Sequence, residues 1–302
     1  MLENLPEIFI VGAAKSGTTT LAYLLSKHPD IYMPRKEPGF FAFYNCAQDD
    51  IPSEIRPYQV TKLEDYIALY KDKPTGHVAL DASVANLTHS ERAISNFNKV
   101  FGPDIARQKK YIIILRNPVD RAFSHYKMML RNGNEELSFE EAIAPEIVAS
   151  RIHRRSGYDY LGFSLYAERV SQYVKAFPTV KVFLQEDLKN TEQLSRELID
   201  FTGLGGVIEA SKNEVLNVSG APKSKLLGRL MRSKPTRFKD FIKSKVPQSA
   251  VHSFQKMKMR ATAMNVKPIH MAPETREKLV PEFKEDVLRL QDLLQRDLSN
   301  WL

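Results

Sequence analysis

Four short runs of apolar residues stand out along the first two thirds of the chain. They cover residues 7–11, 77–81, 110–116 and 180–185. Unbroken apolar runs of this length are typical of strands covered on both faces, as in a parallel sheet. The pattern therefore predicts four buried strands.

The segments between these runs place their apolar residues at helical spacing. Helices are predicted over residues 18–28, 91–101 and 119–131, the last with Pro118 in the favoured first turn. One more apolar stripe precedes the fourth strand: Tyr166, Val170, Tyr173, Val174 and Phe177. Alternating strands and helices indicate an α/β fold, a parallel sheet flanked by helices, with ligands at the carboxyl ends of the strands.

The last third shows no obvious strand, and prolines divide it into short pieces: Pro222, Pro235, Pro247, Pro268 and Pro273. Its end repeats apolar residues every three or four positions: Leu279, Phe283, Val287, Leu290, Leu294 and Leu298, with Trp301 on the same face. This spacing predicts a closing helix packed on the core. We expect one domain over residues 1–302, with a core at about 5–205 and a helical C-terminal lid region at about 206–302.

Composition narrows the class of protein. The chain has 302 residues, 43% of them hydrophobic, enough for a full core. No stretch approaches the roughly 20 apolar residues that span a bilayer, so no membrane anchor is expected. The single cysteine, Cys46, allows no internal disulfide and favours a reducing compartment. The expected location is cytoplasmic.

The excess positive charge is concentrated in one segment. Residues 223–245 hold nine basic residues and one acid, an excess equal to the net +8 of the whole chain. Such a segment contacts a polyanion, a membrane surface or a charged cofactor in some proteins, and is a solvated helix face in others. Charge alone leaves these alternatives open.

The first apolar run leads into a small-residue loop that suits an anion. Gly12, Lys15 and Gly17 precede a threonine-rich helix start. A Walker A loop has its lysine directly after the second glycine, whereas Lys15 stands two residues before Gly17. Backbone N–H groups, a helix N-terminus and a lysine still make a phosphate cradle. The pattern predicts a nucleotide other than ATP.

A second anion-binding pattern follows the third apolar run. Arg116 stands at the strand tip and Ser124 lies eight residues later in the next helix. A forked guanidinium and a hydroxyl can hold one phosphate from two sides. Arginines at strand ends often make ordinary ion pairs, but two such sites on neighbouring turns favour ligand binding.

Together these motifs resemble the sulfotransferase family, over residues of about 7–43, 77–131 and 158–205 and again at the terminal helix. The resemblance implies transfer of a sulfuryl group from 3′-phosphoadenosine 5′-phosphosulfate (PAPS), with release of PAP. It implies that the first loop holds the 5′-phosphosulfate and that Arg116 and Ser124 hold the 3′-phosphate. The first-loop residues are Lys15, Ser16, Gly17, Thr18, Thr19 and Thr20. Lys15 is then the catalytic cation, and no metal is required.

The resemblance also suggests a general base. Glu37 lies in a segment similar to the K-E-x-x-F-F stretch of carbohydrate-type sulfotransferases, where that glutamate is the proposed base. A carboxylate in a mostly apolar loop is suited to a raised pKa. The alternative is a turn residue, or a partner for Lys36. Gly39 stands where those enzymes often have a histidine.

Two further residues are acceptor-side candidates. Asp81 and Ser83 follow the second apolar run, in a segment similar to one that lies beside the sulfuryl group in the family. Cap or strand-end roles are the alternative. Ala82 stands where heparan-type members commonly have a lysine.

The basic segment begins with a stretch similar to the family's late cofactor loop, which assigns Lys223 and Ser224 to the 3′-phosphate. Gln185 stands where steroid and phenol enzymes often have a tyrosine, and their late R-x-G-x-x-G signature is missing. These departures favour the carbohydrate or heparan-type branch.

The leading hypothesis is a PAPS-dependent sulfotransferase acting on a hydroxyl, or an amine, of a small-molecule or sugar acceptor. One alternative is a P-loop nucleotide kinase, with residues 78–81 as a Walker B strand and a need for Mg²⁺. The other is a polyanion- or nucleic-acid-binding module using residues 223–245. The leading hypothesis expects no nucleic-acid partner. It leaves the acceptor and the oligomeric state open.

Overall fold

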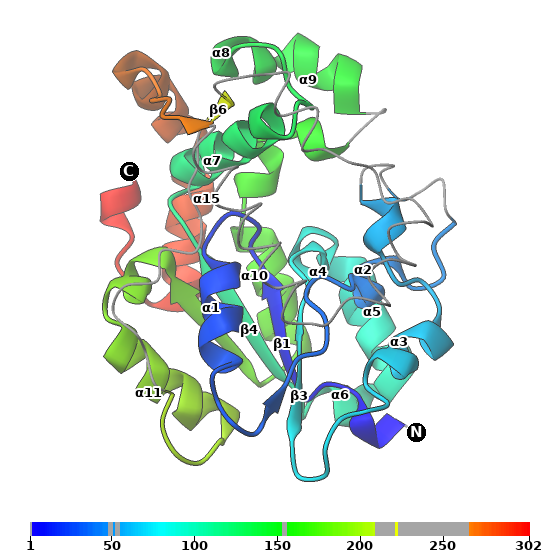
Figure 1. The fold of residues 1–302 in the computed structure, drawn as a ribbon. Helices are drawn as coiled ribbons and strands as arrows, with labels where there is room; N and C mark the ends of the chain where they lie inside the picture. The colour runs from blue at the N-terminus through cyan, green and yellow to red at the C-terminus, as the bar shows by residue number, and fades with distance from the viewer. Residues whose placement is uncertain (1, 48–50, 52–54, 153–155, 209–220, 223–265) are drawn as a thin grey trace.

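A five-stranded parallel sheet forms the centre of the protein (Figure 1). The computed structural model describes residues 2–47, 51, 55–152, 156–208, 221–222 and 266–302. The strand order is β2-β3-β1-β4-β5. The strands are β1 (Ile8–Gly12), β2 (Ile31–Tyr32), β3 (Val78–Ala82), β4 (Lys110–Leu115) and β5 (Val180–Leu184).

The central strand β1 lies where the direction of chain progression across the sheet reverses. The chain moves from β1 to β2 and β3 on one side, then returns past β1 to β4 and β5 on the other. Phe9 of β1 is in register with Asp81 of β3 and Tyr111 of β4. In open parallel sheets such a reversal leaves a crevice at the carboxyl ends of the strands. The loops after β1 and β4 therefore lie on either side of that crevice.

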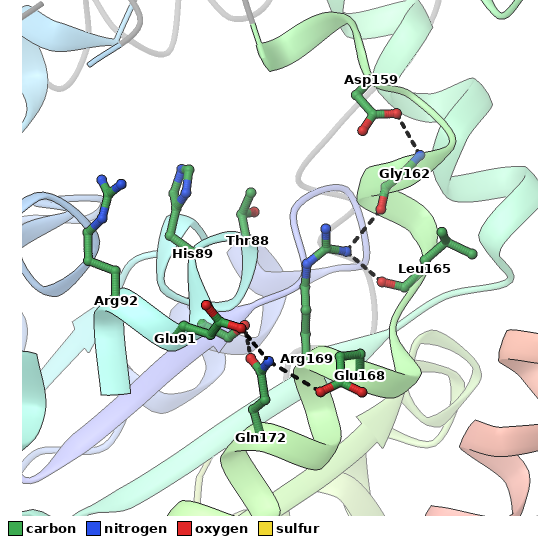
Figure 2. A pocket seen from close by; sticks show the side chains of 11 residues that line it. Thr88, His89, Glu91, Arg92, Asp159, Gly162, Leu165, Glu168, Arg169 and Gln172 are labelled. Atoms are coloured by element: carbon green, nitrogen blue, oxygen red, sulfur yellow. Dashed lines mark hydrogen bonds between the residues drawn. The ribbon is translucent and has the colours of Figure 1, made fainter. Parts of the chain in front are cut away.

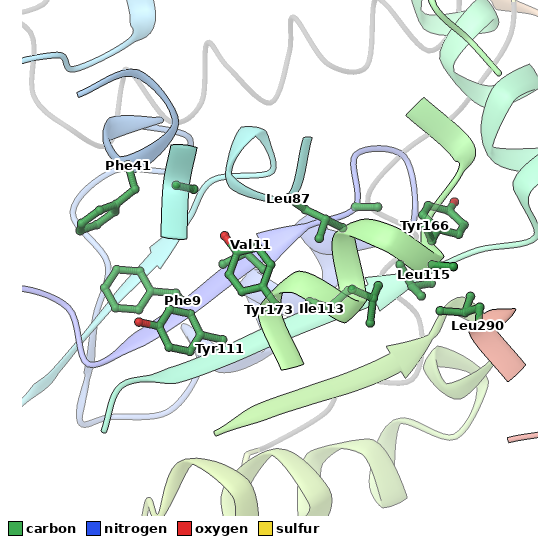
Figure 3. Close-up of a cluster of buried hydrophobic side chains, with 14 of the residues drawn as sticks. Phe9, Val11, Phe41, Leu87, Tyr111, Ile113, Leu115, Tyr166, Tyr173 and Leu290 are labelled. Atoms are coloured by element: carbon green, nitrogen blue, oxygen red, sulfur yellow. The ribbon is translucent and has the colours of Figure 1, made fainter. Parts of the chain in front are cut away.

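Helices cover both faces of the sheet (Figure 1). Alternate β1 residues face opposite layers: Ile8 and Ile10 pack with α1 (Thr18–Leu25) and α11 (Thr191–Thr202). Phe9 and Val11 face the larger core shown in Figure 3. The long helices of that second layer are α5 (Ser90–Phe101), α10 (Ala167–Ala176) and α15 (Pro273–Leu294). Helix α7 (Pro118–Arg131) follows β4 directly.

Shorter elements complete the described fold. The remaining α-helices are α2 (Phe40–Phe43), α3 (Leu63–Leu69), α4 (Ala85–Thr88), α6 (Pro103–Ala106), α8 (Phe139–Ala142) and α9 (Pro145–Ile152). Short 3-10 helices cover Leu2–Asn4, Arg56–Tyr58, Ser156–Tyr158, Gly162–Ser164, Gln185–Lys189 and Ser299–Trp301.

The α/β fold and all four predicted strands are confirmed, each within about a residue of its expected ends. The sequence pattern did not predict β2, because a strand of two residues has no detectable periodicity. Helix α1 ends at Leu25 rather than residue 28, since Pro29 disfavours helical geometry at the residue before it. The last third, expected to lack strands, contains the two-residue antiparallel pair β6 (Ala221–Pro222) and β7 (Val266–Lys267). Most of the expected lid, residues 209–220 and 223–265, lies outside the described residues.

The closing helix is confirmed as part of the core. Leu279, Phe283, Val287 and Leu290 of α15 are buried in the larger cluster. Asp286 accepts hydrogen bonds from the Tyr166 and Ala167 N–H groups at the start of α10, at 2.7 and 3.1 Å. Helix α15 thus fixes the position of α10 as well as covering the sheet.

The last residues of the chain pack against the segments that follow β4 and β5. Trp301 is 2% exposed, and its Nε1 donates to Glu186 Oε1 at 3.1 Å. The Trp301 carbonyl accepts from Asn117 Nδ2 at 3.4 Å. Asn117 directly follows the predicted anion-binding residue Arg116.

No helix among the described residues is long and apolar enough to cross a membrane.

We expect Trp301→Ala to lower the free energy of unfolding by about 3–5 kcal/mol, because it removes a buried aromatic side chain and leaves a cavity. Trp301→Phe retains most of the packing and loses only the Nε1 hydrogen bond, so its effect should be clearly smaller. Urea unfolding followed by circular dichroism measures both. Equal losses for the two variants would contradict a packing role.

Candidate anion-binding and catalytic site

Three loops that carry predicted site residues meet at the carboxyl edge of the sheet. They follow β1, β3 and β4, which are neighbours in the order β3-β1-β4. The Ala13 N–H of the first loop donates to Ile114 O of β4 at 2.8 Å, and the Ser83 N–H donates to Ile10 O of β1 at 3.0 Å. The topology thus brings together residues that lie about a hundred positions apart.

The loop between β1 and α1 leaves backbone donors available for a ligand. Lys15 and Gly17 have left-handed φ values of 72° and 111°. Gly17 caps α1 without any side-chain hydrogen bond. The first helical bond runs from Leu21 N to Gly17 O, so the N–H groups of Thr18 to Thr20 have no partner within the helix. An uncapped helix start of this kind favours an anion.

Gly17 and Ser16 have requirements of their own. The positive φ of Gly17 favours glycine, and a Cβ there would also push on the tip of the Leu188 side chain, 2.6 Å away. The Ser16 N–H, which we expected to contact the ligand, donates to Ala13 O at 3.2 Å. The Ser16 hydroxyl is buried without a hydrogen-bond partner among the described residues.

Lys15 lies in a strongly cationic environment. Burial, and then repulsion by Arg131, Arg121, Arg116 and Lys127, together lower the pKa of Lys15 to about 8. Among the described residues, the four charged groups that act most strongly on Lys15 are all cationic. A partly buried cluster of like charges is unfavourable unless an anion compensates it. This electrostatic imbalance is the strongest sign of a ligand in the described structure.

Arg121 has a positioning role that the sequence reading missed. It is 2% exposed, and burial lowers its pKa to about 10. Its Nε donates to Ala14 O at 3.0 Å, and one terminal nitrogen donates to Tyr160 O and Ser164 Oγ, both at 3.3 Å. Arg121 therefore ties the lysine-bearing loop to residues 160–164. The sequence feature that could have indicated this role is its position, five residues after Arg116 and one turn into a helix.

Arg116 lies two residues before α7, and Ser124 lies on the buried side of that helix. Arg116 has a buried Nε with no hydrogen-bond partner among the described residues, and Ser124 is 4% exposed. Asn117 fixes the helix start, since its side-chain oxygen accepts from Val119 N at 3.0 Å and Asp120 N at 3.2 Å. A buried guanidinium nitrogen without a partner is uncommon and calls for a compensating group.

Glu37 contacts the first loop through its neighbour Lys36. Glu37 has a φ of 61°, and its two carboxylate oxygens accept from Lys36 Nζ at 3.1 Å and Val84 N at 3.0 Å. Lys36 Nζ also donates to Thr19 Oγ1 at 2.9 Å. Glu37 therefore lies in an ion pair and not in the apolar surroundings that we expected. The alternative to a base, a turn residue that pairs with Lys36, matches both its positive φ and this contact.

Asp81 and Ser83 are buried behind the Glu37 loop, each at 0% exposure. The Asp81 carboxylate accepts from Tyr66 Oη at 2.6 Å and Ser83 Oγ at 2.5 Å, while Ser83 Oγ accepts from Gly39 N at 3.0 Å. Burial raises the pKa of Asp81 to about 6, against these hydrogen bonds, which lower it. In this conformation the pair supports the loop and makes no contact with solvent.

The remaining predicted binding residues, Lys223 and Ser224, lie outside the described residues. The strand before them, β6, lies beside α7 (Figure 1). Among the described residues there is no group of three or more histidine, cysteine or acidic side chains arranged to hold a metal.

We expect Lys15→Met to raise the stability of the unliganded protein by about 1–3 kcal/mol at pH 7, because a depressed lysine pKa means that protonation opposes folding. The loss of folding stability caused by the charged Lys15 is complete below pH 8. It disappears as the pH approaches 10.5, the pKa of this lysine in the unfolded chain. Melting temperatures of both proteins from pH 6.5 to 10.5 should therefore converge at high pH. A pH-independent difference would contradict the burial of a charged Lys15.

The chain matches the family described as "Sulfotransferase domain" over residues 5–216. It is 25% identical over 209 residues to human heparan sulfate glucosamine 3-O-sulfotransferase 3B1, covering 68% of this chain and 48% of that protein. It is 30% identical over 149 residues to membrane-associated sulfotransferase kil1 of Dictyostelium discoideum, covering 47% of this chain and 28% of that protein. The chain thus spans about half or less of the length of these curated relatives.

One solved structure matches almost the whole chain. The crystal structure of a sulfotransferase from Alicyclobacillus acidocaldarius is 30% identical, covers 98% of both chains and has a TM-score of 0.68.

Proposed function

Because the chain belongs to the sulfotransferase domain family, we propose that it transfers the sulfuryl group of PAPS to a hydroxyl or amine of a small-molecule or sugar acceptor and releases PAP. The cationic cluster around Lys15, beside an uncapped helix start, is the observation that carries this proposal. PAPS has the matching charge, with a phosphosulfate at one end and a separate phosphate at the other.

The residues present fit such a donor. The N–H groups of Thr18 to Thr20 and the Lys15 ammonium suit the phosphosulfate, and the unpartnered Arg116 Nε suits the 3′-phosphate. We retain Gly17, Ser124, Lys223 and Ser224 in the proposed binding set, the last two on the family resemblance alone.

In the proposed reaction an acceptor oxygen or nitrogen forms a bond to sulfur as the bond from sulfur to the phosphate oxygen breaks. The acceptor proton passes to a base. Lys15 stabilises the negative charge that develops on the departing phosphate oxygen, and the helix-start N–H groups hold the sulfuryl oxygens. This chain contributes orientation and charge, which suits a loose transition state of this kind.

Glu37 is the proposed base. Its carboxylate lies within two hydrogen bonds of the first loop, through Lys36 Nζ and Thr19 Oγ1. The backbone bond from Val84 orients the other oxygen. For Asp81 and Ser83 we propose an acceptor-side role exerted through the Glu37 loop, because both are buried and bound to each other.

The two alternatives are supported less well. A kinase with Asp81 as its Walker B carboxylate would need that group free for Mg²⁺, but it accepts hydrogen bonds from Tyr66 and Ser83. The polyanion-binding hypothesis depends on residues 223–245, which lie outside the described residues. Our proposal includes a cytoplasmic location, supported by the single cysteine, and names no metal and no nucleic-acid partner.

We expect the protein to bind PAP in preference to ATP with magnesium, and Lys15→Ala and Arg116→Ala each to weaken PAP binding at least tenfold. Each variant removes a charged hydrogen-bond donor from the ligand, worth about 1.5–3 kcal/mol. Isothermal titration calorimetry measures the affinities, with the exposed Lys71→Ala as control. Preference for ATP, or unchanged PAP affinity in both site variants, would overturn the proposal.

For Glu37→Gln we expect kcat for sulfuryl transfer to fall about 100-fold or more, because general base catalysis contributes about 10²–10⁴. The PAP affinity should stay within twofold, since Glu37 is not a phosphate ligand. Steady-state rates of PAP release with a working acceptor measure kcat. A variant that keeps full kcat would assign the base to another residue.

A further inference from the structure

Lys36 connects the donor-binding helix start to the proposed base. Its ammonium group donates to Thr19 Oγ1 at 2.9 Å and to Glu37 Oε1 at 3.1 Å. Thr19 lies in the first turn of α1, where the backbone N–H groups have no helical partner. A lysine from the segment after β2 therefore reaches the same helix start that serves the predicted phosphate cradle.

The backbone beside Lys36 is fastened to the end of β3. The Glu37 N–H donates to the Ala82 carbonyl at 3.0 Å, and the Gly39 N–H donates to Ser83 Oγ, also at 3.0 Å. Lys36 directly precedes this anchored turn, and its side chain extends from the turn to α1. The fold therefore fixes both ends of this side chain.

The Lys36 ammonium has a hydrogen-bond donor to spare. An ammonium group carries three N–H donors. Among the residues that the structure describes, Thr19 and Glu37 are the acceptors of Lys36, which leaves one donor for a ligand. The Lys36 side chain is 29% exposed, so a ligand can reach it.

The two arginines that line the cavity in Figure 2 have other contacts. Arg169 donates to the carbonyls of Gly162 and Leu165, as Figure 2 shows. Arg92 donates to a backbone carbonyl of α2 and to the cysteine thiol that follows this helix. Within the described part of the chain, Lys36 is the cation that hydrogen-bonds both the α1 start and the proposed base.

The position of Lys36 indicates which part of the donor it meets. In an in-line displacement the attacking atom and the leaving oxygen lie on opposite sides of the transferred group, whose other oxygens lie between them. The proposed base Glu37 belongs to the attacking side, and Lys15 is proposed to meet the leaving oxygen. A cation bonded to Glu37 and to the helix start lies between these two sides.

We propose that the Lys36 ammonium binds the sulfuryl oxygens of PAPS and is a second catalytic cation beside Lys15. The inference rests on the proposed sulfotransferase function and adds a residue to its chemistry. Lys36 keeps its proton, while the acceptor proton passes to Glu37. The positive charge orients the sulfuryl group between the acceptor and the leaving oxygen, and it offsets the repulsion between that group and the Glu37 carboxylate.

PAP and PAPS form a matched pair for the test, because PAP lacks only the sulfuryl group. Lys36→Met should weaken PAPS binding about tenfold or more, the loss expected for one charged hydrogen bond, and leave PAP affinity within about twofold. Lys36→Arg keeps the charge and should lose clearly less PAPS affinity. Isothermal titration calorimetry without an acceptor measures both nucleotides.

The exposed Lys71→Met is the control for the loss of a lysine and should bind both nucleotides as the unmodified protein does. If Lys36→Met has the same ratio of PAPS to PAP affinity as the unmodified protein, Lys36 is a partner of Glu37 alone and the inference is overturned. Unmodified protein that binds neither nucleotide would instead refute the proposed function itself.

Discussion

The burial of a lysine among other cations at the carboxyl edge of the sheet is the constraint on which the rest of the structure depends. Burial, and then repulsion by four nearby basic groups, makes it costly to charge Lys15. The fold holds this arrangement by fixing the backbone around it. The unliganded protein thus stores an electrostatic cost that an acidic ligand removes, so ligand binding and folding stability are coupled.

The supports of the site come from distant parts of the chain. Arg121 holds Ala14, and Asn117 both caps α7 and contacts the Trp301 carbonyl. On the acceptor side, the buried pair of Asp81 and Ser83 holds the Gly39 N–H and with it the turn that presents Glu37. The same edge of the sheet therefore combines a cationic environment for the donor with a buried support for the Glu37 turn.

Local patterns in the sequence were enough to predict the sheet and the donor-binding loops. They did not predict the buried contacts that hold those loops in place. The apolar runs predicted β1, β3, β4 and β5, because a strand buried on both faces has no polar alternation. The Lys15 and Arg116 motifs were visible because they combine short spacing with a strand end. Arg121 looked like any helical arginine, and Asp81 looked available for chemistry. Only the three-dimensional structure shows that Arg121 donates hydrogen bonds to backbone carbonyls and that Asp81 accepts one from the Tyr66 hydroxyl.

The place of β1 in the sheet also has a consequence for how the chain folds. Ile8 pairs with Leu80 on one side and Lys110 on the other, so β1 is completed only by segments far along the chain. Forming such distant contacts requires the closure of large loops, and the entropy of closure is lost before any strand pairing is gained. Folding is therefore slow. Until then an apolar strand with two unpaired edges is exposed, a state prone to association with other chains. The arrangement that places the lysine loop at the centre of the sheet therefore leaves β1 without strand partners until β3 and β4 have formed.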